Sequence, residues 1–361
     1  MTGRIHALSI CIMLAWSFSL LTSGQLHAFQ WEQKRYKDLP YVGFDSFVEF
    51  YEFEQIGLKK VMSITEKELE FIHLKGPLGA CYMRAGSREM YFNGRLFWLS
   101  LPVYKAENEK LYVSRVDLVK LLEPVLRPND IKMRKECIGV VIDPGHGGAD
   151  HGAKGKLGLR EKKLNLDVAQ RLREILKEQK IATVMTRYRD TFLTLEKRAS
   201  LASKYKGFIF VSIHFNYSRS SKSKGVETYS LTPRFSPSTN DTRTRMRHSD
   251  RDKHPGNAMD ELNVVLTNCI QQSLLNLSSK PFDRGIKRAR FVVLRRSTLP
   301  STLIEGGFLS NYSETKLLAK SSYRQEIAQR IAEGIKNYMA LMNDEVTDLK
   351  APQVQGLDLR Q

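Results

Sequence analysis

The sequence predicts an α/β protein whose main domain is a mostly parallel, twisted sheet with helices on both faces, preceded by a small α+β domain. Two observations predict this fold class. From residue 137 onward, short apolar runs of strand length alternate with longer segments whose apolar residues recur at helical spacing, as layered α/β folds require. Between residues 29 and 136, short strand-like runs separated by turn signals dominate instead.

Residues 1–28 have the layout of a secretory signal peptide. Arg4 and His6 precede an apolar stretch from residue 7 to residue 21, and a polar region then ends at Ala28. The alternative is a membrane anchor, but this stretch is shorter than the roughly 20 residues that a spanning helix needs. We therefore expect cleavage after Ala28 and a secreted protein, either periplasmic or at the cell wall.

Residues 29–136 form the predicted small domain. An aromatic-rich segment, residues 44–51, predicts a short helix, and Asn93-Gly94 is a strong hairpin signal between apolar strands. Ser114, with Asp117 three residues on, predicts the start of another helix. Short strands are expected at 68–74, 80–84, 88–92 and 110–113, and a linker at 128–136. The domain is either a module that binds the wall or a partner, or a spacer or folding aid.

The chain is strongly basic, with a formal net charge of +18. No recognition helix, zinc finger or ribonucleoprotein motif accompanies this charge, so we expect no nucleic-acid partner. An anionic cell-wall or membrane surface is the expected partner instead. The cysteines that remain after cleavage, Cys81, Cys137 and Cys269, contain no CxxC pair and are expected to be buried free thiols.

The main domain, residues 137–342, shows the alternation most clearly. Its expected strands and helices follow one another along the chain: a strand at 138–142, a helix after residue 161, a strand at 181–186, a helix at 194–205, strands at 208–213 and 226–231, a long helix at 262–277, strands at 291–294 and up to Glu305, and a closing helix at 327–339. The remaining residues, 343–361, are a predicted flexible tail.

Three of the predicted strands each end in a side chain that can bind a metal or carry a proton. His146 follows the strand that ends at Asp143-Pro144, His214 follows 208–213, and Glu305 ends the last strand. Ligands of open α/β sheets bind outside the carboxyl ends of the strands. A single strand-end histidine is more often structural, but three such ends predict a common site.

Glu161 is the fourth candidate, because it stands at or just before the first turn of the predicted helix. A carboxylate here is also explained by the helix dipole alone.

Four motifs in order, DPGHGG, EKKLN, SIHFN and IEGGFLSN, resemble those of the zinc-dependent N-acetylmuramoyl-L-alanine amidases that cut peptidoglycan. The resemblance covers about residues 137–342. It implies that His146, Glu161 and His214 bind zinc and that Glu305 is the catalytic carboxylate. It also implies peptidoglycan as the substrate, although it identifies no activator protein. Residues 29–136 faintly resemble the small amino-terminal domain of copper amine oxidases, from which no residues are carried over.

The implied chemistry agrees with the residue types. Two histidines and a carboxylate make a common catalytic zinc set that keeps a fourth position for water. Two other classes stay open: a non-catalytic wall-binding protein, and a zinc deacetylase or peptidase that acts on the same polymer. His151 and Glu227 are weaker candidates, expected to be solvent-facing or structural.

The segment 233–257 differs from the rest of the main domain. It holds many arginines and hardly any apolar residue, so we expect it to be a mobile basic loop that helps to hold anionic polymer beside an unblocked site. The short connector before strand 226–231 introduces a complication, since it allows that strand to run antiparallel and to launch the loop from the far edge of the sheet.

Overall fold

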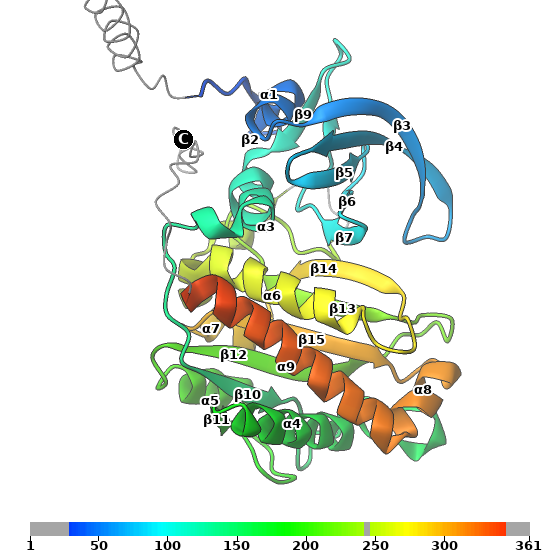
Figure 1. Ribbon diagram of the computed structural model, residues 1–361, viewed down its shortest axis with the longest axis vertical. Helices are drawn as coiled ribbons and strands as arrows, with labels where there is room; N and C mark the ends of the chain where they lie inside the picture. The colour runs from blue at the N-terminus through cyan, green and yellow to red at the C-terminus, as the bar shows by residue number, and fades with distance from the viewer. Residues whose placement is uncertain (1–28, 242–245, 344–361) are drawn as a thin grey trace, which may run out of the picture.

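The computed structural model describes residues 29–241 and 246–343. The predicted signal peptide and flexible tail therefore lie outside the described residues, apart from Asn343. The molecule has two parts, which stack on one another along the long axis (Figure 1). We call them the accessory part, up to about residue 130, and the catalytic part, from residue 137 onward, after the roles predicted for them.

The catalytic part is built on a six-stranded section of sheet in the order β11-β10-β12-β15-β13-β14. The first four strands of this order are parallel, as predicted. The next strand runs antiparallel to β15, and β14 is parallel to it, so the sheet is mixed at this side. The strands are β10 (Gly139–Pro144), β11 (Ala182–Met185), β12 (Phe208–Asn216), β13 (Val226–Leu231), β14 (Asp283–Ala289) and β15 (Ser301–Phe308).

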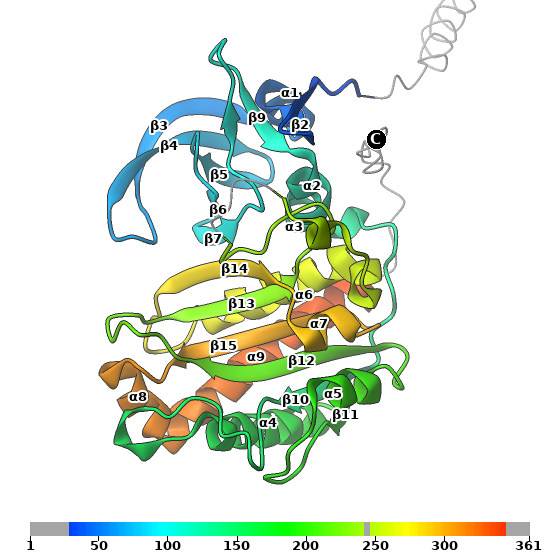
Figure 2. The same ribbon diagram turned by 180° about the vertical axis from the view of Figure 1, so that it is seen from behind.

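Helices cover both faces of this section, which confirms the predicted fold class. The long helices lie on the face seen in Figure 1, and two shorter ones lie on the face seen in Figure 2. The first group is α4 (Glu161–Glu178), α6 (Asp260–Leu274) and α9 (Ser321–Asn343); the second is α5 (Leu195–Ala202) and α7 (Val292–Arg296). One further helix, α8 (Tyr312–Ala319), follows β15 and was not predicted.

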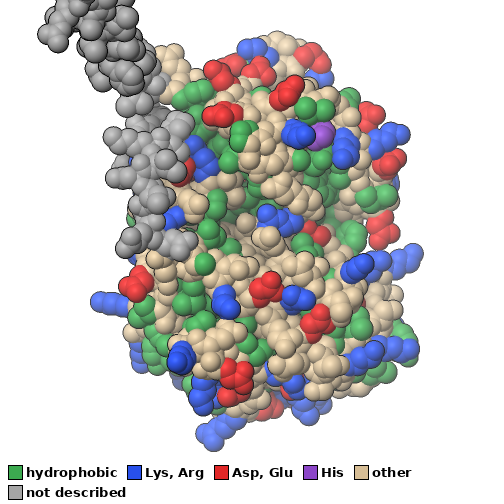
Figure 3. Space-filling model, in the orientation of Figure 1, with side chains coloured by type: hydrophobic (Ala, Val, Ile, Leu, Met, Phe, Trp, Pro, Cys, Tyr) green, Lys and Arg blue, Asp and Glu red, His purple; other side chains and the backbone are tan. Residues whose placement is uncertain are grey.

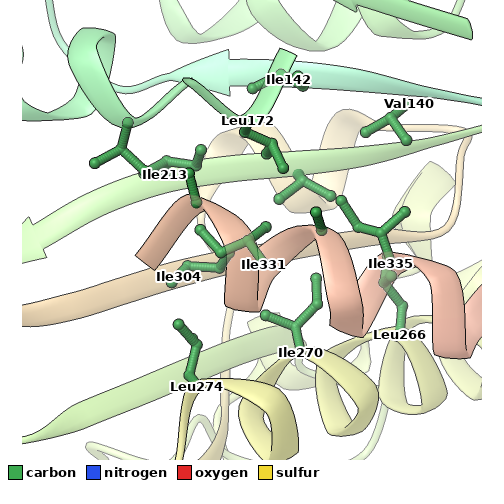
Figure 4. Close-up of a cluster of buried hydrophobic side chains, with 14 of the residues drawn as sticks. Val140, Ile142, Leu172, Ile213, Leu266, Ile270, Leu274, Ile304, Ile331 and Ile335 are labelled. Atoms are coloured by element: carbon green, nitrogen blue, oxygen red, sulfur yellow. The ribbon is translucent and has the colours of Figure 1, made fainter. Parts of the chain in front are cut away.

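The main core lies between the sheet and the long helices. Branched aliphatic side chains from β10, β12 and β15 point toward those of α4, α6 and α9 (Figure 4). Those labelled in Figure 4 are almost completely excluded from water: Val140, Ile142, Leu172, Ile213, Leu266, Ile270, Leu274, Ile304, Ile331 and Ile335. Burying each such side chain stabilises the fold by about 1.5–3 kcal/mol, so this layer fixes the strands whose ends carry the candidate residues.

The accessory part contributes five strands to the large sheet, a small separate sheet, and short helical segments. Five strands continue the large sheet in the order β7-β6-β5-β4-β3, and four form a small sheet in the order β1-β2-β9-β8. They are β1 (Gln33–Tyr36), β2 (Leu39–Gly43), β3 (Glu54–Met62), β4 (Glu68–Gly76), β5 (Gly79–Met83), β6 (Glu89–Phe92), β7 (Arg95–Trp98), β8 (Tyr104–Lys105) and β9 (Leu111–Ser114). The helical segments are α1 (Phe44–Phe50), and α2 (Arg115–Asp117) with α3 (Glu123–Leu126) around a π turn at Leu118–Leu122.

Local signals in the accessory part are confirmed. Asn93 and Gly94 both adopt positive φ in the turn that joins β6 to β7, as a two-residue hairpin turn requires. The Ser114 side chain accepts a hydrogen bond from the Asp117 N–H, 3.1 Å away, and so caps α2.

The two parts are joined through one continuous sheet. Phe97 of β7 pairs with Ile286 of β14, so the accessory strands extend the catalytic sheet. Arg288 of β14 reaches across this junction to Ser100 and Asp117 and is buried there. The boundaries between domains stay a prediction, but the two parts share core residues as well as hydrogen bonds.

The strand predicted at Phe291–Leu294 is wrong. The last three residues of this run begin α7, and the strand lies earlier in the chain, at β14. The run is too short for periodicity to distinguish a helix from a strand.

The segment 233–257 was predicted not to pack, yet its described residues do. Arg88 of the accessory part donates hydrogen bonds to the carbonyls of Thr239 and Asp241, and Arg290 donates to the carbonyl of Ser236. Hydrogen bonds from arginine side chains to its backbone carbonyls therefore hold the segment in place, although it has few apolar residues to bury. Because β13 runs antiparallel to β15, the segment leaves from the far edge of the sheet and does not line the predicted site.

The three cysteines predicted to be buried free thiols, Cys81, Cys137 and Cys269, are so. Within 29–241 and 246–343, no helix has the length and apolar character needed to cross a membrane. Lysine and arginine side chains are scattered over both parts of the molecule on the face seen in Figure 3, and acidic side chains lie among them.

Candidate active site

His146, Glu161 and His214 meet at the carboxyl edge of the catalytic sheet. Glu161 Oε1 lies 3.1 Å from His146 Nε2 and 2.9 Å from His214 Nδ1. One donor atom from each residue lies within 4.8 Å of the other two. Two imidazole nitrogens and a carboxylate oxygen make a donor set that suits zinc. The three residues predicted from sequence therefore converge in an arrangement that a zinc ion fits.

His146 is held in an unusual backbone conformation. Its φ is +59°, in the left-handed region that non-glycine residues rarely adopt. Its Nδ1 lies 2.8 Å from Asp150 Oδ2, which leaves Nε2 facing Glu161. A carboxylate on the second ring nitrogen is the usual way in which proteins orient a metal-binding histidine. Asp150 was not predicted from the sequence.

The turn that carries His146 needs a glycine beside it. A Cβ on Gly145 would lie 2.1 Å from His214 Cε1, closer than any real contact. The glycine therefore lets the His214 ring approach the backbone of the turn, so that the two imidazoles lie with ring centroids 5.0 Å apart.

Two buried arginines hold the same turn through hydrogen bonds to its backbone carbonyls. Arg198 donates to Asp143 Oδ1 at 2.8 Å, and to the carbonyls of Pro144 at 2.7 Å and His146 at 2.6 Å. Arg187 donates to the carbonyls of Pro144 and Gly145. Burial opposes ionisation of Asp143, but Arg198 and two hydroxyl donors lower the pKa of its carboxyl below the ordinary value. The network holds His146 in place despite its unfavourable φ.

Glu161 is the first residue of α4, as predicted. Its second oxygen, Oε2, accepts a hydrogen bond of 2.8 Å from the Ala153 N–H. Burial opposes ionisation, but hydrogen bonds from His146 and His214 lower the pKa of Glu161 well below its ordinary value. The Glu161 carboxylate is therefore charged, and a cation bound between the two imidazoles would contact it.

Glu305 lies directly beside His214, because the two are register partners in β15 and β12. Its Oε2 is buried without a hydrogen-bond partner among the described residues. Burial, together with the negative charges of Glu161 and Glu227, raises the pKa of Glu305 well above its ordinary value. A buried carboxyl oxygen without a hydrogen-bond partner lowers the stability of the fold by about 1–3 kcal/mol or more. Such an oxygen calls for an explanation, and a catalytic role is a common one.

Glu227 and His151 take the minor roles expected of them. Glu227 accepts from Asn216, Tyr229, Arg284 and Lys287, each within 2.5–2.8 Å. Burial opposes its ionisation, but Lys287 and Arg284 lower the pKa of Glu227. With both oxygens paired, it is a structural carboxylate. His151 is exposed and lies 3.2 Å from Arg160.

Comparison with known proteins bears on the catalytic part. The family model described as N-acetylmuramoyl-L-alanine amidase matches residues 140–337. The chain is 34% identical over 217 residues to the N-acetylmuramoyl-L-alanine amidase AmiA of Escherichia coli K12, which covers 55% of this chain and 75% of that protein. It is 31% identical over 229 residues to AmiA of Salmonella typhimurium LT2, with 58% and 79% covered.

The chain belongs to the N-acetylmuramoyl-L-alanine amidase family. It is a peptidoglycan hydrolase with N-acetylmuramoyl-L-alanine amidase activity. Among solved structures, the catalytic domain of the amidase CwlV from Bacillus (Paenibacillus) polymyxa var. colistinus is 35% identical. That match covers 56% of this chain and 98% of that one, with a TM-score of 0.46. The family match begins at residue 140, so the resemblance of the accessory part to a copper amine oxidase domain stays a prediction.

Proposed function

We propose that this amidase is a secreted zinc enzyme in which His146, Glu161 and His214 bind one zinc ion and Glu305 transfers the proton. The observation that carries the proposal is the convergence of the three donor atoms within 4.8 Å of one another. Glu305, the register partner of His214 in the neighbouring strand, brings a buried, unpaired carboxyl oxygen to the same site. Zinc, when bound, polarises the amide carbonyl and lowers the pKa of a water molecule.

The residues of the chain supply the rest of the reaction. Glu305 accepts a proton as the water oxygen bonds to the lactyl carbonyl carbon, and returns a proton to the nitrogen of L-alanine as the carbon–nitrogen bond breaks. The products are a free carboxyl group on the muramic acid and a free amine on the peptide. Proton transfer by a positioned carboxyl contributes on the order of a hundred- to ten-thousand-fold.

Asp150 and the two arginines position the proposed zinc ligand His146. Asp150 sets the orientation of the His146 ring, and Arg198 with Arg187 holds the turn from which it projects. Glu227 keeps Lys287 and Arg284 paired beside Glu305. Glu305 is therefore the carboxylate left available to take a proton.

The proposed location is the periplasm or cell wall, after cleavage behind Ala28. Edman sequencing or intact mass of the protein secreted by an expressing cell tests this. A mature chain that starts at Phe29 is expected, and retention of residues 1–28 would contradict it.

Mass analysis of purified peptidoglycan digested by the protein tests the reaction. Free peptides with an amino-terminal L-alanine, beside glycan strands of unchanged acetylation, are expected. Loss of acetyl groups would indicate a deacetylase, and shortened peptides still attached to glycan would indicate a peptidase. A chelator should abolish release of the peptides, and added zinc should restore it.

A further inference from the structure

A groove of about 650 Å³ lies between the accessory part and the catalytic part. One wall belongs to the catalytic part: Lys222 and Lys224 before β13, residues 279–282 before β14, Asn311 before α8, and Ser313, Glu314 and Leu317 of α8. The other wall is Glu66, at the tip of the β3–β4 hairpin. The hairpin extends over the edge of the sheet from which α8 also projects (Figures 1 and 2).

The groove lies at the same edge of the sheet as the active site. Lys222 and Lys224 belong to the connector that leaves the carboxyl end of β12, two strand residues beyond His214. Glu314 in the groove accepts hydrogen bonds of 2.7 Å from the N–H groups of Gly225 and Phe308. Gly225 stands two residues before Glu227, the register partner of Glu305. At about 3.3 Å per strand residue, the groove begins roughly 7–10 Å from Glu305.

The two walls carry opposite charges. Lys222, Lys224 and Lys280 are exposed, and none of them forms a salt bridge among the described residues. The Glu314 carboxylate does not neutralise them by direct contact, because its two oxygens are bound to backbone N–H groups. Glu66 is the exposed carboxylate on the facing wall. The groove therefore suits a ligand that bears carboxylates on one side and an amine on the other.

We propose that this groove binds the stem peptide of the substrate, with peptide carboxylates on Lys222, Lys224 and Lys280 and a peptide amine on Glu66. The inference rests on the proposed function, since it needs the scissile amide to lie beside Glu305. An extended peptide spans about 3.3–3.6 Å per residue, so a group three to five residues beyond the scissile bond lies about 10–18 Å away, within the groove. The accessory part is then part of the substrate site.

The lysine wall is tested with two soluble N-acetylmuramoyl peptides that differ only in a free or an amidated terminal carboxylate. The triple variant Lys222→Gln, Lys224→Gln, Lys280→Gln should raise KM about tenfold for the free acid, with kcat unchanged, and should leave the amide nearly unaffected. A control with the same charge change at exposed positions away from this edge, Lys177→Gln, Lys204→Gln, Lys336→Gln, should alter neither. An unchanged KM, or equal rises on both peptides, would overturn the proposal.

Glu66 is tested with a peptide that carries a free side-chain amine and its acetylated form. Glu66→Gln should raise KM severalfold for the free amine alone, and Glu70→Gln, on β4 of the same hairpin, should not. An identical KM for wild type and Glu66→Gln on both peptides would show that the accessory part takes no part in binding. Failure of the wild type to cut any of these peptides at the muramoyl–alanine amide would contradict the proposed function itself.

Discussion

His214 and Glu305 are register partners in the neighbouring parallel strands β12 and β15. Paired positions in adjacent strands lie about 5 Å apart and present their side chains on the same face. The sheet itself therefore sets the separation between a proposed zinc ligand and the proposed proton carrier, and neither depends on a loop for its position. His146 enters the same site from the turn after β10, and Glu161 enters it from the first residue of α4.

Replacing His146 or His214 with alanine should remove zinc and activity together. Each supplies one of three donor atoms, and two donors hold zinc much more weakly than three. Metal analysis after gel filtration should give about one zinc per chain for the wild type and well below that for either variant. A normal zinc content in both would contradict the assignment of the site. Replacing exposed His151 with alanine is the matched control and should change neither.

Asp150→Asn should weaken zinc binding without unfolding the protein. The variant keeps the size of the side chain but loses the charge that orients the His146 ring, a type of loss that typically costs 10–100-fold in metal affinity. Competition with a zinc-binding dye measures this affinity. Because Asp150 is exposed, the free energy of unfolding measured without metal should be nearly unchanged. Equal zinc affinities for variant and wild type would show that Asp150 does not support the site.

The parts of the site that lie on regular structure could be predicted from the sequence. Apolar runs before Asp143 and His214 indicated buried strands, and parallel strands bring their ends to one edge. The helical spacing after Glu161 placed this residue in the first turn. These are local patterns, and a local pattern predicts the structure correctly when the tertiary packing requires the same element at that position.

The supports of the site could not be predicted in the same way. Arg187 and Arg198 lie outside the four motifs, and no local pattern shows that both would be buried against the backbone of the 143–146 turn. The pairing of β7 with β14 rests on contacts between distant parts of the chain. The segment 233–257 has too few apolar residues to predict packing, and the arginines that bind its carbonyls, Arg88 and Arg290, lie far from it in the sequence.

Arg288→Met should destabilise the junction of the two parts. Arg288 and Asp117 are both almost completely excluded from water, and breaking a buried pair by removing one partner costs about 3–5 kcal/mol. Urea unfolding should show this loss in a transition shared by probes in both parts, since they share one sheet. Arg296→Met, at an exposed position, should cost less than about 0.5 kcal/mol. A loss below about 1 kcal/mol for Arg288→Met would show that the junction does not depend on this residue.

Asp260 should make the stability of the protein fall as the pH rises. Burial raises the pKa of its carboxyl to about 6 in the folded protein, whereas the unfolded value is near 3.9. Between these values the unfolded state loses its proton first, so stability falls between about pH 4 and pH 6 and then stays constant. Asp260→Asn should remove this fall, and its advantage over wild type should grow by on the order of 2–3 kcal/mol from pH 4 to pH 7. A constant difference across this range would contradict the assignment.

The most direct test of the proposed mechanism is to measure zinc content and turnover in one preparation of Glu305→Gln. The substitution keeps size and shape but removes the group that accepts a proton, and Glu305 is not one of the three proposed ligands. We predict about one zinc per chain, as in the wild type, with turnover on soluble N-acetylmuramoyl peptide lower by two or more orders of magnitude. Full zinc content with near wild-type turnover would contradict the role assigned to Glu305.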